Sequence, residues 1–189
     1  EISRKDEVWI SQSGLITIAG GKLTGYRKMA EDTVDAASRL IGLAQADGGD
    51  DTPLPGGDFT GGIDNLLLHL TQKYPMNDAA ALRLVRLYGA EAEQVLALGA
   101  ESLVTTGNVL SGEVAWALQK EGAQSLEDVI YRRTRAALYQ PEEAAPIVPR
   151  LADLMGAELG WAEDKKAREI AQVTALLNAD KTSLLSSVA

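Results

Sequence analysis

The sequence has 189 residues, a formal net charge of -9 and no cysteine. This length suits one domain of ordinary size, or one domain with part of another. The acidic balance disfavours duplex nucleic acid and anionic lipid surfaces as partners, since both attract basic proteins. The lack of cysteine excludes disulfides, thiolate metal sites and cysteine nucleophiles, and no apolar run approaches the roughly 20 residues that span a bilayer.

The N-terminal region is expected to form a β-hairpin followed by a helix. Residues 8–11 and 15–18 are rich in β-branched and apolar side chains, and the Gln12-Ser13-Gly14 stretch between them has the composition of a turn. After Gly20 and Gly21, apolar residues recur every three or four positions, which predicts one apolar helix face, with Thr24 as its N-cap. That face comprises Leu23, Tyr26, Met29, Ala30, Val34, Ala37 and Leu40.

The rest of the chain divides into an acidic linker and a helical region. Residues 46–60 are rich in Asp, Gly and Pro, which predicts a linker. From residue 61 onward the pattern predicts a bundle of about six helices. Among its boundaries, Asn77 or Asp78 caps a helix that Gly89 ends, and Ser125 caps a helix over residues 125–138. The expected fold is therefore mainly α, with domain limits of 1–45, 46–60 and 61–189.

The first residues, Glu1 to Glu7, contain neither an initiator methionine nor a signal-peptide core. A two-stranded hairpin with one helix is marginally stable alone. We therefore expect residues 1–45 either to pack on the bundle or to belong to a larger sheet, as part of a longer protein.

The stretch with the clearest chemical meaning is Gly20, Gly21, Lys22, Leu23 and Thr24, placed between a strand and a helix. Two glycines allow a flat or charged ligand to approach the backbone, and the helix directs its positive end toward the same place. With the charge of Lys22, such a turn favours an anion or a ring that becomes anionic on reduction. The alternative is a tight strand-to-helix turn with a solvated lysine.

Several motifs together resemble the C-terminal region of FAD-dependent, respiratory-type glycerol-3-phosphate dehydrogenases. The residues at 20–24 (GGKLT) and 127–135 (EDVIYRRTR) carry the most specific similarity. Residues 54–57 (LPGG), 87–89 (LYG) and 159–161 (LGW) follow in the family's order. The resemblance implies that residues 1–45 are the end of an FAD-binding domain and that residues 61–189 form the family's C-terminal helical domain.

The resemblance also implies an activity and a set of site residues. The family oxidises sn-glycerol 3-phosphate to dihydroxyacetone phosphate with FAD and passes the electrons to quinone. By position, Arg4 and Lys22 would bind substrate, and Gly20, Gly21, Lys22, Leu23 and Thr24 would contact FAD. No catalytic residue and no metal ligand is expected in this chain.

The resemblance further implies partners and a location. The upstream FAD-binding domain of the same protein would be the direct partner, because the GxGxxG turn that binds the adenine half of FAD is missing here. The fragment alone should therefore be inactive and should not bind FAD tightly. Since mitochondrial members carry added EF-hands, the parent is expected to be bacterial and cytoplasmic, associated peripherally with the inner face of the cell membrane.

Two other functions are also compatible with the sequence. A glycerol-3-phosphate oxidase, which passes electrons to oxygen, shares the same architecture. A helical interaction module without enzymatic activity fits the charge and the lack of a nucleophile constellation, although it gives no reason for a flavin-type turn.

Four further features have structural interpretations. Arg132, Arg133 and Arg135 form a basic cluster in which Arg132 and Arg135 should share a helix face, and a structural or interdomain salt-bridge role is favoured. His69 is expected to be a packed or surface histidine, because the sequence places no other metal ligands around it. The acidic residues 47–58 lack the ligand order of an EF-hand and are expected to be a solvated linker. Trp116 and Trp161 are expected in the core or at an interface.

Overall fold

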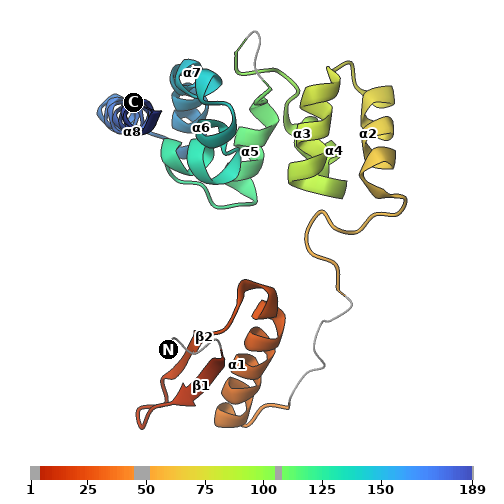
Figure 1. Cartoon of the computed structure of the whole chain (residues 1–189), viewed down its shortest axis with the longest axis vertical. Helices are drawn as coiled ribbons and strands as arrows, with labels where there is room; N and C mark the ends of the chain where they lie inside the picture. Colours follow the sequence, from red (N-terminus) through yellow and green to blue (C-terminus); the bar gives the residue numbers. More distant parts are fainter. Residues whose placement is uncertain (1–4, 45–51, 105–107, 189) are drawn as a thin grey trace. The chain divides into compact units, whose positions relative to one another are not determined.

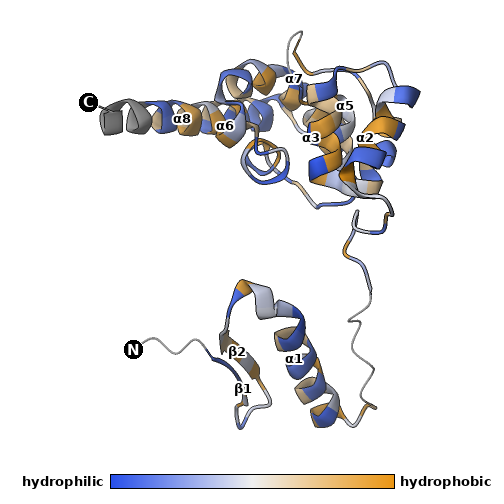
Figure 2. Cartoon of the chain, turned by 45° about the vertical axis from the view of Figure 1, so that its right-hand side comes forward, coloured by the Kyte–Doolittle hydropathy of each residue, from blue (hydrophilic) through white to orange (hydrophobic). Residues whose placement is uncertain are grey.

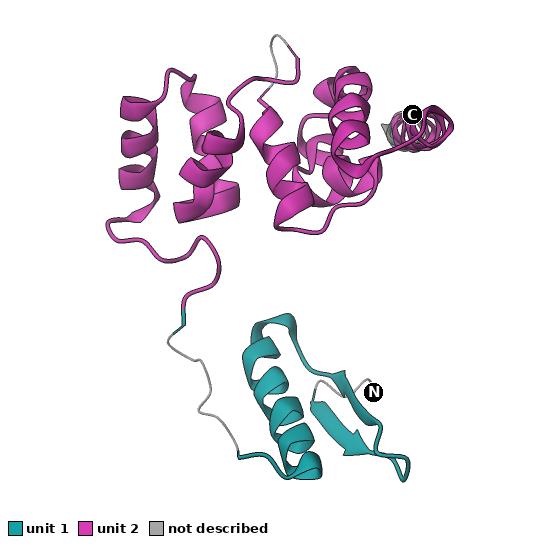
Figure 3. Ribbon diagram, turned by 180° about the vertical axis from the view of Figure 1, so that it is seen from behind, with its two compact units in different colours: residues 1–52 teal, residues 53–189 magenta. Residues whose placement is uncertain are grey.

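The computed structural model describes residues 5–44, 52–104 and 108–188, with side chains as far as Lys181. The chain forms two compact units, residues 1–52 and 53–189, shown in different colours in Figure 3. Figure 1 shows the elements in chain order, and most of them are helices. The expectation of a mainly α chain that begins with a β-hairpin and a helix is confirmed.

The first unit consists of the hairpin and one long helix. Strand β1 (Asp6–Ile10) pairs antiparallel with β2 (Ile16–Gly20), and Val8 lies opposite Ile18. A short 3-10 turn, η1 (Leu23–Gly25), leads into α1 (Tyr26–Ile41). The sheet formed by the described residues has these two strands.

The apolar face expected for α1 is only partly covered by the hairpin. Met29 and Leu40 lie toward the hairpin, where they face Gly21 and Gly14. Leu23 is 90% exposed and Val34 is 60% exposed, so part of this apolar face stays uncovered within the unit. The physical reason is size, because a two-stranded hairpin is too narrow to cover a helix whose apolar residues extend around it.

The N-cap predicted for this helix is wrong. Thr24 lies inside the 3-10 turn, and Gly25 occupies the N-cap position of α1 without a side-chain hydrogen bond. The helix therefore begins one residue later than a cap at Thr24 would imply.

The second unit contains seven α-helices among its described residues, one more than the approximate number expected. They are α2 (Gly62–Lys73), α3 (Asp78–Tyr88), α4 (Ala92–Leu98), α5 (Ser111–Gln119), α6 (Ala136–Tyr139), α7 (Pro141–Leu159) and α8 (Glu163–Val188). Two shorter elements, the 3-10 turn η2 (Gly89–Glu91) and the π-helical segment η3 (Asp128–Arg133), connect them. Within this described part of the chain, no helix has the length and apolar character needed to cross a bilayer.

Two hydrophobic clusters form the core of the second unit. One joins α2, α3 and α4 to Leu110 and Trp116, and the other joins α5, η3, α6, α7 and α8. The apolar residues, orange in Figure 2, lie mostly where these helices face one another. Trp116 is 6% exposed and meets Tyr88 edge to face, while Trp161 packs against the second cluster. The core placement expected for both tryptophans is confirmed.

The predicted helix boundaries of this unit are confirmed at three places. The Asn77 side chain accepts a hydrogen bond of 2.8 Å from the Ala80 amide, as an N-cap should. Gly89 ends α3 with a φ of 55°. Ser125 accepts a hydrogen bond of 3.1 Å from the Asp128 amide, and the Asp128 carboxylate accepts one from the Ser125 amide in return.

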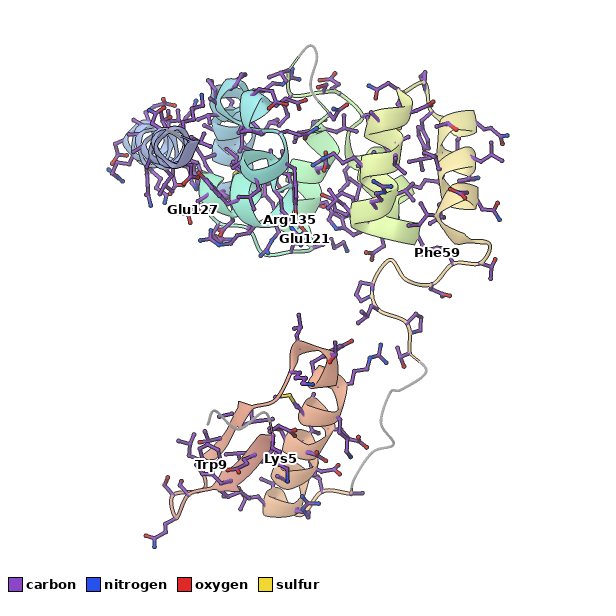
Figure 4. All side chains as sticks on the ribbon, in the orientation of Figure 1. Lys5, Trp9, Phe59, Glu121, Glu127 and Arg135 are labelled. Atoms are coloured by element: carbon purple, nitrogen blue, oxygen red, sulfur yellow. The ribbon has the colours of Figure 1, made fainter. Side chains whose placement is uncertain are left out.

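The continuous helix predicted over residues 125–138 is wrong. The Thr134 amide donates to the Val129 carbonyl, five residues back, and this bond produces the π-helical segment η3. Arg135 then adopts a φ of 55°, and α6 starts after it (Figure 4). Because of this break Arg132 and Arg135 do not share a helix face, which corrects the prediction for the basic cluster.

The structural role favoured for the arginines agrees with the contacts of two of them. Arg132 donates to Glu127 at 2.5 Å and to Asp128 at 2.8 Å. Arg133 donates to the Glu121 carbonyl at 2.7 Å. Arg133 therefore connects η3 to the segment after α5, while Arg132 pairs with acidic residues one turn earlier in its own element.

A buried ion pair connects α3, α5 and the segment around Thr134. Both carboxylate oxygens of Glu113, which is fully buried, accept from Arg83 at 2.8 Å. Glu113 also accepts from the Tyr88 hydroxyl and the Leu110 amide, while Arg83 donates to the Thr134 carbonyl at 3.2 Å. Burial is the main reason that the pKa of Tyr88 is raised. Each oxygen of the Glu113 carboxylate thus accepts hydrogen bonds from two neighbouring groups, which is the condition under which a buried charge is tolerated.

The segment at residues 54–57 packs on the junction of α3 and η2. The Ala90 amide donates to the Gly56 carbonyl at 2.9 Å. A Cβ added to Gly56 would overlap the Tyr88 carbonyl, and one added to Gly89 would overlap the Gly56 carbonyl. The two glycine motifs of the sequence, LPGG and LYG, therefore meet so closely that neither Gly56 nor Gly89 has room for a side chain.

His69 lies on the surface of α2, as predicted. Its Nε2 is 3.1 Å from a Glu93 carboxylate oxygen, and Lys73 and Tyr74 contact the same carboxylate. The hydrogen bonds from Lys73, the larger effect, and from His69 lower the pKa of Glu93 to about 2. The described residues contain no group of three or more side chains suited to a metal ion.

Candidate functional site

The candidate site is the turn between β2 and α1, where two consecutive glycines have left-handed backbone conformations. Gly20 has a φ of 87° and Gly21 a φ of 77°. Residues other than glycine rarely adopt such angles, so both positions require glycine on conformational grounds alone. The pair redirects the chain from the end of the strand toward the start of the helix.

Atoms of the same unit also fill the space beside both glycines. A Cβ added to Gly20 would overlap the carbonyl oxygen of Lys5. A Cβ added to Gly21 would lie 2.5 Å from the Met29 sulfur and 3.2 Å from the Asp6 Cβ. On this side of the turn, the close packing of β1 and α1 leaves room only for glycine at both positions. The sequence alone did not predict this packing.

The opposite side of the turn is open. Lys22 is extended and exposed, and Leu23 is 90% exposed. Thr24 is exposed as well, and the Gly25 amide donates to the Lys22 carbonyl at 2.9 Å. A Cβ added to Gly25 would meet no atom within 4 Å. The turn therefore presents an ammonium group, an apolar side chain and a hydroxyl on one accessible stretch next to the start of a helix.

This set of groups fits one edge of a ring that is both apolar and capable of negative charge. Leu23 offers an apolar surface, Thr24 offers a donor and acceptor, and Lys22 offers a positive charge. The structure brings five of the six predicted site residues together in this turn. The sixth, Arg4, lies outside the described residues.

The first unit exposes several large apolar side chains, on both the hairpin and α1. On the hairpin, Trp9 (Figure 4) is 48% exposed and Leu15 is 65% exposed. On α1, Val34 and Ile41 are 60% and 67% exposed. Contiguous exposed apolar patches mark interaction surfaces in proteins, so these side chains are candidates for contacts with another surface.

The helical unit contains two cavities lined by its own residues. One, of about 470 Å³, is lined by Pro55, Glu91, Gln94, Trp116, Lys120 and Glu121. Burial raises the pKa of Glu121, while the nearby charge of Arg133 opposes that shift. The other, of about 300 Å³, lies between α5 and α7, where Arg150 and Glu101 form an ion pair. Neither cavity is lined by a predicted site residue.

Comparison with known proteins identifies the family. Residues 49–166 match the family model of the C-terminal domain of alpha-glycerophosphate oxidase. The chain belongs to this family. It corresponds to the C-terminal region of FAD-dependent glycerol-3-phosphate dehydrogenases, which confirms the resemblance seen in its motifs.

Individual relatives agree with this assignment. The chain is 37% identical over 196 aligned residues to the mitochondrial glycerol-3-phosphate dehydrogenase of Mus musculus, covering 93% of this chain and 25% of the relative. It is 34% identical to the aerobic glycerol-3-phosphate dehydrogenase of Bacillus subtilis, covering 94% of this chain and 35% of the relative.

A solved structure is also similar. The glycerol-3-phosphate dehydrogenase of Bacillus halodurans, complexed with FAD, aligns with a TM-score of 0.77 and 29% sequence identity. The alignment covers 90% of this chain and 36% of that structure. The chain therefore spans about a quarter to a third of the length of the proteins it matches.

Proposed function

We propose that the protein containing this chain is an FAD-dependent glycerol-3-phosphate dehydrogenase, which oxidises sn-glycerol 3-phosphate to dihydroxyacetone phosphate. The observation that carries the proposal is the match of 90% of the chain to a solved dehydrogenase that binds FAD. The exposed turn of residues 20–24 supports it, because its open side fits a flavin edge. When bound, FAD would supply the acceptor for the hydride removed from the substrate.

Within this function, the turn residues would have distinct tasks. Gly20, Gly21 and Thr24 would contact the flavin through the backbone and the hydroxyl, and Leu23 would cover it with an apolar side chain. Lys22 would stabilise negative charge on the ring or on the substrate phosphate. Arg4 would bind the phosphate, a task that suits the two-pronged guanidinium group.

We further propose that the chain needs the rest of its parent for activity. It lacks a GxGxxG turn, and its first unit exposes the apolar surface described above. In this proposal, residues 1–45 are a strip of the FAD-binding domain, residues 46–60 a linker and residues 61–189 a helical domain. The upstream FAD-binding domain is then the direct partner, and the chain alone is inactive.

The electron acceptor separates two versions of this proposal. We propose quinone as the acceptor of a bacterial, cytoplasmic enzyme that associates peripherally with the inner face of the membrane. The second candidate is a glycerol-3-phosphate oxidase, which the description of the matching family model favours. Comparing quinone-analogue reduction with oxygen consumption by the parent protein distinguishes these versions.

A flavin titration tests the proposal. The purified chain and the parent protein are each titrated with FAD, with and without glycerol 3-phosphate, and are followed by flavin absorbance and tryptophan fluorescence. We expect no tight binding by the chain alone, and bleaching of the bound flavin by substrate in the parent. Stoichiometric, tight binding by the chain alone would contradict its dependence on the parent.

Two lysine variants of the parent test the role of the turn. Lys22→Gln should weaken substrate or flavin binding at least tenfold, whereas Lys28→Gln should leave both unchanged, because Lys28 pairs with Glu31 and Asp32 on the exposed surface of α1. Equal behaviour of the two variants would exclude a specific role of Lys22. A parent that neither binds FAD nor oxidises glycerol 3-phosphate would favour the non-enzymatic interaction module.

A further inference from the structure

Met29, on α1, lies against the glycine turn at Gly21. Its sulfur and methyl carbon lie 2.5 and 2.9 Å from the position of a Cβ on Gly21, with the Asp6 Cβ on the same side at 3.2 Å. The thioether therefore occupies the volume that a side chain at residue 21 would need. Met29 is half-buried and lies one turn into the helix that the glycine turn introduces.

The position of Gly21 decides the direction in which the next residues point. Its φ of 77° is a conformation that glycine occupies freely but does not hold by itself, since glycine has the largest backbone freedom of all residues. A contact that fills one side of Gly21 removes that freedom. Lys22 and Leu23 follow directly, so the orientation of both depends on this contact.

Leu40 offers a comparison at the other end of the same interface. Its Cδ2 lies 3.8 Å from the Cβ position of Gly14, in the turn that connects the two strands. Met29 and Leu40 are thus both apolar residues of α1 that face the hairpin, but only Met29 faces the candidate site. A change at either residue loosens the same interface at opposite ends.

We propose that Met29 is a positioning residue for the flavin- and substrate-binding turn, acting through Gly21 without contact to either ligand. The inference rests on the proposed function for its consequence in catalysis. The mechanical part, that Met29 restrains residues 20–24, concerns this chain alone. A flexible, polarizable thioether suits the task because it adapts to an irregular backbone surface.

Hydrogen exchange in the purified chain tests the mechanical part without any flavin. Amide exchange of a peptide covering residues 20–25 is compared in wild type, Met29→Ala, Met29→Leu and Leu40→Ala. We expect Met29→Ala to accelerate exchange in this peptide about tenfold more than Leu40→Ala does, and Met29→Leu to restore most of the protection. Equal acceleration by Met29→Ala and Leu40→Ala would overturn the proposal.

The same variants in the parent protein test the functional part. Met29→Ala should raise the FAD dissociation constant or the KM for glycerol 3-phosphate about tenfold. Leu40→Ala should lower the melting temperature about as much as Met29→Ala does, without raising the dissociation constant or the KM. If wild type is active and Met29→Ala binds both ligands like wild type, the positioning role is wrong. If wild type has no activity with glycerol 3-phosphate, the proposed function fails, and the exchange experiment still decides whether Met29 restrains the turn.

Discussion

Replacing Arg83 by methionine should strongly destabilise the helical unit. Methionine keeps most of the apolar stem but removes the charge, and Glu113 would stay fully buried without its cationic partner. Removing one member of a buried ion pair costs about 3–5 kcal/mol. The Thr134 carbonyl would also lose a donor, which contributes about 1 kcal/mol or less.

The expected shift in melting temperature follows from the size of the unit. With an unfolding entropy of about 2.1 cal/mol/K per residue, a unit of roughly 140 residues loses about 0.3 kcal/mol per degree near its midpoint. A loss of about 3–5 kcal/mol then lowers the melting temperature by roughly 10–17 °C. Thermal and urea unfolding followed by circular dichroism at 222 nm measure this change.

Two further variants make the reasoning refutable. Arg86→Met is the matched control, because Arg86 lies on the same helix and is exposed, and it should change the stability by about 0.5 kcal/mol or less. The double variant Arg83→Met/Glu113→Gln should be more stable than Arg83→Met, since a neutral amide is easier to bury than a carboxylate. A loss of less than about 1 kcal/mol in Arg83→Met, or no recovery in the double variant, would refute the argument.

Three more predictions concern single positions. Gly20→Ala should destabilise the hairpin by more than about 2 kcal/mol, since its Cβ would overlap the Lys5 carbonyl. Gly25→Ala, whose Cβ meets no atom within 4 Å, should be tolerated, and hydrogen exchange in β1 and β2 measures both effects. Arg135→Gly should stabilise the chain by about 0.5–1 kcal/mol in urea unfolding, as glycine relieves the φ of 55°, and a destabilised variant would contradict this. Glu93 has a folded pKa of about 2, below its ordinary value of 4.5, so its contribution is present above pH 4.5 and is lost as the pH falls toward 2. Glu93→Gln should therefore lower stability at pH 6 more than at pH 3, and equal losses at both would contradict the assignment.

The local signals of the sequence were sufficient for most of the secondary structure. Caps such as Asn77 and Ser125 act within three residues of the chain, so their consequences are visible in the sequence. The break at Arg135 was not visible, because the donor to the Thr134 carbonyl at this point is Arg83 on α3, which is distant in sequence. Tertiary contacts of this kind override local helix preference.

The candidate site was only partly accessible from the sequence. The residues from Gly20 to Thr24 are adjacent in the chain, so a turn could be predicted from composition and order. The role of Met29 could not be predicted. Periodicity places a residue on the apolar face of a helix but does not show which other segment that residue contacts. The exposed side chain of Val34 shows the same limit, since its apolar character and spacing do not show whether another surface covers it.

The two most specific motifs of the chain have different physical meanings, and this difference bears on what the family assignment establishes. The arginines of the EDVIYRRTR stretch make contacts within the helical unit. Arg132 binds Glu127 and Asp128, and Arg133 binds the Glu121 carbonyl. Such contacts explain why the helical domain keeps its shape, but they carry no chemistry. The turn at residues 20–24 leaves its charged and apolar groups exposed, which the stability of this unit alone does not require. Similarity in the helical domain therefore identifies the family, while the case for flavin chemistry depends on the turn and on the variants of Lys22 and Met29 that test it.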